Sequence, residues 1–122
     1  MRNTVGFFLL LTSLCWATGL SSQVKFKAGQ DMVTLKGAVV HGDRDTYSLG
    51  AVVGQDMIVT IQSPENNAVF QIYGPSGKPL PHAGESDDAK TFTGRIPSNG
   101  NYKIVVGPTR GNATYKLRIK ID

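Results

Sequence analysis

The segment that decides the fold class is YKLRIKI, residues 115–121, near the end of the chain. Apolar and charged residues alternate strictly along it, which places the two kinds on opposite faces of a β-strand. We therefore expect one face in a hydrophobic core and the other in water. We interpret the lysines of the solvent-exposed face as protection of an edge strand against pairing with other chains. Binding of anionic cell-wall polymer or lipid headgroups is the alternative.

The same period-2 alternation recurs upstream and is interrupted by Gly, Pro, Asn and Asp. It predicts an opening strand over 23–27 and further strands near 33–39, 47–51, 57–62, 68–72, 92–96 and 102–106. No segment has a helical period. Turns at intervals of about 8–12 residues are typical of an all-β sandwich. The sequence therefore predicts an antiparallel β-sandwich of about eight short strands, with a closed β-barrel as the alternative.

The first residues have the composition of a secretory signal peptide. Arg2 precedes an apolar run over 5–17, and small residues follow in 18–22. The apolar run is shorter than the ~20 residues that span a bilayer. We expect cleavage after Gly19 or after Ser21, and take 1–21 as the leader and 22–122 as one domain. The mature chain is expected in the periplasm or outside the cell, without membrane insertion.

Composition narrows the possible chemistry of the mature chain. Cys15 is the only cysteine and would leave with the leader, so no disulfide, thiol nucleophile or cysteine-ligated metal is expected. The whole chain has 13 Lys and Arg against 9 Asp and Glu, and losing Arg2 leaves a net charge of +3. No dense basic cluster of the kind that binds nucleic acid is present. We predict no cofactor and no nucleic-acid partner.

Catalytic and metal sites find weak support in the sequence. The two histidines, His41 and His82, both fall in predicted loops, and no Gly-x-Ser-x-Gly elbow is present. His41, Asp43 and Asp45 are spaced two apart, which could place them on one side of an extended segment around a cation. The simpler interpretation is that the aspartates cap backbone N–H groups in a turn. We predict no enzyme and no metal site.

Two loops stand out as binding candidates. Residues 74–89 hold three Pro and three Gly and form the longest predicted loop. Residues 97–101, Pro-Ser-Asn-Gly-Asn, predict a tight hairpin, because Asn-Gly readily adopts the positive φ angles of a type I′ turn. A rigid sandwich with polar end loops usually binds rather than catalyses.

Several short motifs together resemble a known family. They are 42–47 (GDRDTY), 54–55 (GQ), 73–75 (YGP), 97–106 (PSNGNYKIVV) and 109–110 (TR). This set is similar to the bacterial periplasmic inhibitors of goose-type (g-type) lysozyme, and to the β-sandwich domain appended to many secreted bacterial peptidases. The similarity runs from about Phe26 to Ile121.

The resemblance implies a function and contact residues. In the inhibitor family, loops at one end of the sandwich plug the substrate groove of a g-type lysozyme. Carried over by position, the contacts are the expected hairpin, the segment before the last strand, and the loop before Asp45. The residues implied are Ser98, Asn99, Gly100, Asn101, Arg110, His41 and Asp43. The alternative is a non-catalytic accessory module that binds a cell-wall carbohydrate or a protein through Tyr73, His82 or the 74–89 loop.

Overall fold

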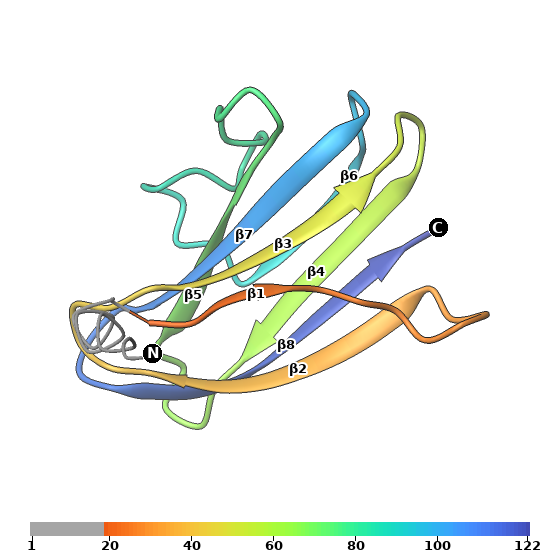
Figure 1. Ribbon diagram of the computed structural model, residues 1–122. Coiled ribbons are helices and arrows are strands. Elements are labelled where there is room, and N and C mark those ends of the chain that lie inside the picture. The colour runs from red at the N-terminus through yellow and green to blue at the C-terminus, as the bar shows by residue number, and fades with distance from the viewer. Residues whose placement is uncertain (1–18) are drawn as a thin grey trace, which may run out of the picture.

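Two four-stranded sheets packed face to face form the domain (Figure 1). The computed structural model describes residues 19–122, so Cys15 and nearly all of the predicted leader lie outside the described residues. One sheet has the order β1-β3-β7-β5, with bounds Ser21–Gln23, Asp45–Ala51, Gly100–Pro108 and Ala68–Tyr73. The other has the order β2-β8-β4-β6, with bounds Met32–Val39, Ala113–Ile121, Asp56–Gln62 and Thr91–Arg95. The predicted all-β sandwich is confirmed, and the described strands do not close into a barrel.

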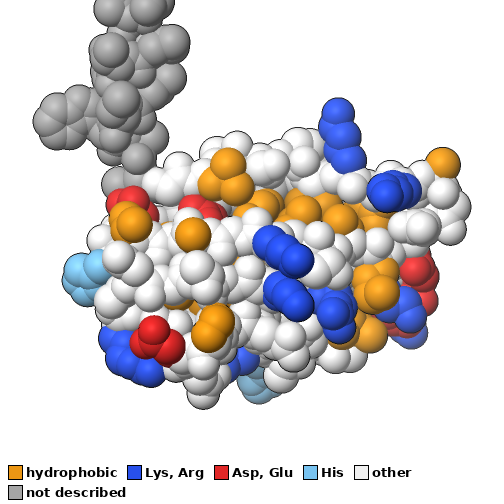
Figure 2. Space-filling view, turned by 90° about the horizontal axis from the view of Figure 1, so that it is seen from below, with side chains coloured by type: hydrophobic (Ala, Val, Ile, Leu, Met, Phe, Trp, Pro, Cys, Tyr) orange, Lys and Arg blue, Asp and Glu red, His pale blue; other side chains and the backbone are white. Residues whose placement is uncertain are grey.

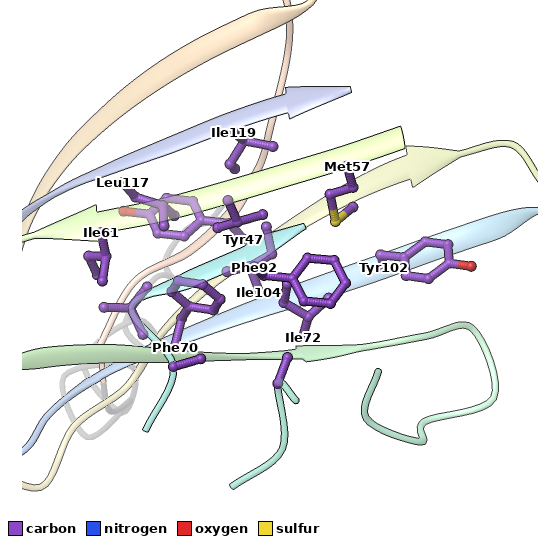
Figure 3. Packing of buried hydrophobic residues seen from close by; sticks show 14 of the residues in the cluster. Tyr47, Met57, Ile61, Phe70, Ile72, Phe92, Tyr102, Ile104, Leu117 and Ile119 are labelled. Carbon is purple, nitrogen blue, oxygen red and sulfur yellow. The ribbon is translucent and has the colours of Figure 1, made fainter. Parts of the chain in front are cut away.

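The core lies between the sheets, as the alternation predicts. Along β8, every second residue from Ala113 to Ile121 is buried. In the facing sheet, β7 turns Tyr102, Ile104 and Val106 inward, each with no exposed surface. Figure 3 shows aromatic and aliphatic side chains from both sheets meeting in this layer. Burial of each large apolar side chain stabilises the folded protein by about 1.5–3 kcal/mol relative to leaving that side chain exposed.

The expectation that the last strand lies at a sheet edge is wrong. β8 is central, because β2 pairs with it on one side and β4 on the other, both antiparallel. Its lysines therefore do not protect an open edge. They form a basic outer face with Lys36, which lies directly opposite Lys116 in the β2–β8 pair. Lys and Arg side chains gather on this side of the molecule in Figure 2.

The opening strand differs from its prediction in position and direction. β1 covers Ser21–Gln23 rather than 23–27, and it pairs with β3 in parallel, so one sheet is not wholly antiparallel. The periodicity at 23–27 reflects the buried Val24 and half-buried Phe26, which pack on the core beyond the end of β1. Side-chain alternation records burial and not strand pairing, which explains the shift.

The predicted hairpin at 97–101 is also wrong. β6 pairs with β4, whereas β7 pairs with β3 and β5, so residues 96–99 cross from one sheet to the other. Gly100 has a φ of 144°, but Asn99 does not have the positive φ that a type I′ turn needs. We call this segment the 96–99 connection.

The long loop between β5 and β6 has a structural role. Backbone N–H groups of Phe70 and Ile72 donate to the carbonyls of Ala89 and Ala83, and Leu80 N–H donates to the carbonyl of Ile72. The loop thus covers the free edge of β5 with hydrogen bonds and adds buried side chains to the core. No helix long and apolar enough to cross a membrane occurs among residues 19–122.

Candidate functional site

Three loops meet at one end of the sandwich, which we call the Arg110 end. They are 40–44, 63–67 and 109–112, and buried Asn67 joins two of them. Its Nδ2 donates to the carbonyls of Arg110 and Asn112 at 3.0 and 3.1 Å, and its carbonyl accepts from Thr109 N–H at 2.9 Å. Asn112 joins the third loop, because its Oδ1 accepts from His41 N–H at 2.8 Å. These bonds fix the loops before any partner arrives.

The predicted contact residues of this end are accessible. Arg110 and His41 are exposed, and Asp43 is half-buried. The Arg110 guanidinium donates through one Nη to the carbonyl of Glu65 at 2.7 Å. That bond lays the side chain across the 63–67 loop, and a guanidinium has five N–H donors in all. Arg110 can therefore keep this bond and still offer a pair of donors to a carboxylate.

The 96–99 connection lies at the opposite end, which we call the Asn99 end. Asn99 Oδ1 accepts from Val53 N–H at 2.7 Å, and the Tyr102 hydroxyl donates to the carbonyl of Ser98 at 2.7 Å. Ser98, Asn99, Gly100 and Asn101 are all exposed. The connection is therefore well ordered, although it is not a hairpin.

The structure separates the predicted contact residues into two groups. Ser98, Asn99, Gly100 and Asn101 lie where β7 begins, whereas Arg110, His41 and Asp43 lie beyond its end. β7 has nine residues, so at about 3.3 Å per residue the groups are roughly 30 Å apart. Figure 1 shows the two sets of loops at opposite ends of the sandwich. The expectation that they share one end of the sandwich is therefore wrong, and which of them contact a partner stays a prediction.

A buried polar chain lies just beneath the Arg110 end. Asp45 is 2% exposed, and its Oδ2 accepts from the Tyr115 hydroxyl at 2.5 Å. The Tyr47 hydroxyl then donates to the Tyr115 oxygen at 2.6 Å. Burial, followed by the hydrogen bond to Asp45, raises the pKa of Tyr115, and burial raises the pKa of Tyr47. Both phenols stay protonated at neutral pH and can donate.

These hydrogen bonds also separate the three residues considered as ligands of a cation. The carboxylate of Asp45 points inward to Tyr115, so it is not on the surface with His41 and Asp43. Among residues 19–122, no three His, Cys, Asp or Glu side chains are grouped to hold a metal ion.

The sequence interpretation missed an apolar tip at the Asn99 end. Val52 and Val53 are 55% and 54% exposed in the turn between β3 and β4, and Asn99 binds that turn directly. Ala51, Val52 and Val53 are three successive apolar residues that break the alternation of β3, and that break was the available sign that the strand ends there. A cavity of about 310 Å³ lies at the same end, lined by Tyr73, Gly74, Pro75, Gly77, Asn101 and Lys103.

Comparison with known proteins bears on the whole domain. No protein-family model matches the chain. It is 29% identical over 119 residues to the inhibitor of g-type lysozyme of Escherichia coli (strain K12), covering 98% of this chain and 80% of that protein. The crystal structure of PliG from Aeromonas hydrophila, a periplasmic inhibitor of g-type lysozyme, superposes with a TM-score of 0.72 at 26% identity. That match covers 87% of this chain and 99% of the inhibitor.

A domain of a secreted peptidase shares the fold alone. The pre-peptidase C-terminal domain of a Bacillus anthracis collagenase superposes with a TM-score of 0.59 at 15% identity, covering 85% of this chain and 96% of that domain. Both resemblances expected from the sequence are thus confirmed, and the first extends to sequence as well as fold. The proteins that this chain is similar to, over nearly all of its predicted mature length, are the periplasmic inhibitors of g-type lysozyme.

Proposed function

We propose that this protein is a periplasmic, non-catalytic inhibitor of a g-type lysozyme, and that the Arg110 end enters the substrate groove of the enzyme. The function rests on similarity in sequence and fold to proteins named as such inhibitors. One observation carries the choice of end. Arg110 is exposed on loops that buried Asn67 holds in place.

The chemistry of a glycosidase groove favours this end. Glycoside hydrolases generally use carboxyl groups beside the scissile bond. An arginine with free N–H donors can bind such a carboxylate with two parallel hydrogen bonds. Arginine is also enriched among the residues that dominate interface energies, whereas valine is under-represented. The Asn99 end presents Val52, Val53 and neutral polar groups, and its arginine, Arg95, is already paired with Asp56 at 3.3 Å.

Pre-ordering adds to the affinity expected of this end. The 109–112 loop is tied by Asn67 and Asn112, so little conformational entropy is lost when it docks. His41 and Asp43 lie in the adjacent loop and are proposed as flanking contacts, with His41 N–H already held by Asn112.

The test is inhibition of a g-type lysozyme on cell walls by the chain without its leader. Chicken-type and invertebrate-type lysozymes serve as specificity controls. We expect selective inhibition of the g-type enzyme. Replacing Arg110 with Ala should weaken binding by roughly 30-fold, equivalent to about 2 kcal/mol. Arg110→Lys should recover little, because lysine cannot make the paired contact.

Matched variants at the other end decide between the two surfaces. Ser98→Ala and Val53→Ser change exposed side chains at the Asn99 end. We expect both to inhibit as the wild type does. If they abolish inhibition and Arg110→Ala does not, the Asn99 end is the inserted one. Failure of the wild-type chain against every lysozyme would overturn the function itself.

The accessory-module alternative has one supporting observation. The cavity of about 310 Å³ at the Asn99 end includes Tyr73, whose ring could stack on a sugar. Sedimentation of the purified chain with insoluble peptidoglycan separates the two functions. Co-sedimentation that Tyr73→Ala removes, together with no lysozyme inhibition, would favour the module.

A further inference from the structure

The buried carboxylate of Asp45 faces the backbone nitrogen of Leu20. Leu20 N–H donates to Asp45 Oδ1 at 2.8 Å, and the Leu20 carbonyl accepts from Thr46 N–H at 2.7 Å. Asp45 is 2% exposed. The two bonds fix Leu20 beside Asp45 at the first residue of β3.

Asp45 lacks a cationic side-chain partner among the described residues. The ion pairs within residues 19–122 join Arg95 to Asp56 and Lys120 to Asp122. The neighbouring Arg44 directs its guanidinium to the carbonyl of Asp43. A buried carboxylate with only neutral donors is costly unless a positive charge lies close to it.

Signal-peptide removal can supply that charge. The sequence leaves two bonds open, after Gly19 or after Ser21. Hydrolysis of the Gly19–Leu20 peptide bond consumes one water, gives Gly19 a carboxylate, and makes the Leu20 nitrogen a primary amine that is protonated at neutral pH. The nitrogen that now donates as an amide would then donate as an ammonium from the same place. Ala17 and Gly19 also provide the small residues that such a site requires.

We propose that the leader is cleaved between Gly19 and Leu20, and that the new ammonium of Leu20 forms a buried ion pair with Asp45. Cleavage after Ser21 would instead remove Leu20 together with its bonds to Asp45 and Thr46. It would leave the Asp45 carboxylate with the Tyr115 hydroxyl alone. This inference rests on the leader and the fold, and is independent of lysozyme inhibition.

The first test is the intact mass of the protein exported to the periplasm from the full-length precursor. We expect the mass of a chain that begins at Leu20. A chain that begins at Ser22, or one that keeps its leader, would overturn the proposal.

The second test isolates the charge. Chains beginning at Leu20 and at Thr18 both keep the Leu20–Asp45 hydrogen bond, but only the first places an ammonium there. We expect the Leu20 chain to melt at least about 4 °C higher, and the difference to vanish when both chains carry Asp45→Asn. Equal melting temperatures would refute the ion pair.

Asp45→Asn could itself prevent folding, so a third truncated protein, which begins at Ser22, provides a test that does not need this variant. Chains beginning at Thr18, Leu20 and Ser22 then all retain Asp45. The ion pair requires a maximum in melting temperature at Leu20. A melting temperature that rises steadily with chain length would contradict it.

Discussion

Gly37 lies directly opposite Tyr115 in the β2–β8 pair, and its missing side chain leaves the space that the tyrosine ring fills. A Cβ at position 37 would lie 2.5 Å from the Tyr115 hydroxyl oxygen. That hydroxyl is the donor to buried Asp45. A glycine in one sheet thereby determines whether a polar chain that reaches the other sheet can form.

Replacing Gly37 with Ala should therefore destabilise the protein. The ring has to move, which strains the core and weakens its bond to Asp45. We expect a loss of about 1–3 kcal/mol in the free energy of unfolding, measured by urea denaturation. Gly50→Ala is the control, since the nearest atom to its Cβ is Asn101 Oδ1 at 3.8 Å. Equal stability of the two variants would show that the contact with Tyr115 is not tight.

The Tyr47–Tyr115–Asp45 chain predicts a loss of stability in alkali. The pKa of each phenol is raised above the ordinary value of 10.0, so folding favours the protonated form. This contribution is complete below pH 10 and declines as the pH rises above it, because the unfolded chain ionises first. We expect the melting temperature to fall above pH 10. Tyr115→Phe should make the melting temperature fall less steeply with pH. Tyr73→Phe is the control, because Tyr73 takes no part in the Tyr47–Tyr115–Asp45 hydrogen bonds, and it should leave the fall unchanged.

Asn67 should control both stability and inhibition at the Arg110 end. Asn67→Ala removes both amide bonds to the 109–112 loop and leaves two carbonyls with one donor fewer. We expect a loss of about 2 kcal/mol in the free energy of unfolding, and weaker lysozyme inhibition in proportion to loop disorder. Asn101→Ala, at an exposed position of β7 without a positive φ, controls for the loss of an asparagine side chain. Loss of stability without weaker inhibition would argue against insertion of this end.

Gly100 should be essential for the shape of the Asn99 end. Its φ of 144° disfavours any side chain, and a Cβ there would lie 2.6 Å from Pro75 Cγ. We expect Gly100→Ala to lower the free energy of unfolding by roughly 1–3 kcal/mol. Gly77 also has a positive φ, but a Cβ added there would meet no atom within 4 Å. Gly77→Ala therefore measures the effect of the backbone conformation alone. A loss no larger than that of Gly77→Ala would rule out a role for the Pro75 contact.

The alternation of residues predicted the strands well, because the side of a strand on which a residue is buried follows from its place in the local sequence. Along β8 the sequence period and the burial period agree at every position. Which strands pair is set by contacts between distant segments, and periodicity does not record them. That is why β8 could be mistaken for an edge strand. It is also why residues 97–101 looked like a hairpin, although the strands on either side of them belong to different sheets.

The candidate site was harder to predict than the fold. The resemblance pointed to Arg110 and to Asn99 as parts of one surface. The predicted strand at 102–106 lies between them, however, and a single strand separates the loops at its two ends, so the sequence already indicated that they lie apart. Asp45 looked like a surface residue of a polar loop, because its burial depends on Tyr115, 70 residues away. Asp45 does lie on the buried phase of β3 with Tyr47, Leu49 and Ala51, but a carboxylate on that phase looks like a loop residue until its partner is known.

The position of the chain ends has a practical consequence for immobilising the protein. Asp122 N–H donates to the carbonyl of Asp56, which places the carboxyl terminus at the Asn99 end. Leu20 lies beside Asp45, at the Arg110 end. An affinity tag after Asp122 would therefore attach the protein to a sensor chip with its Arg110 loops facing the solution. A tag at the amino terminus would obstruct those loops and cover the nitrogen that meets Asp45.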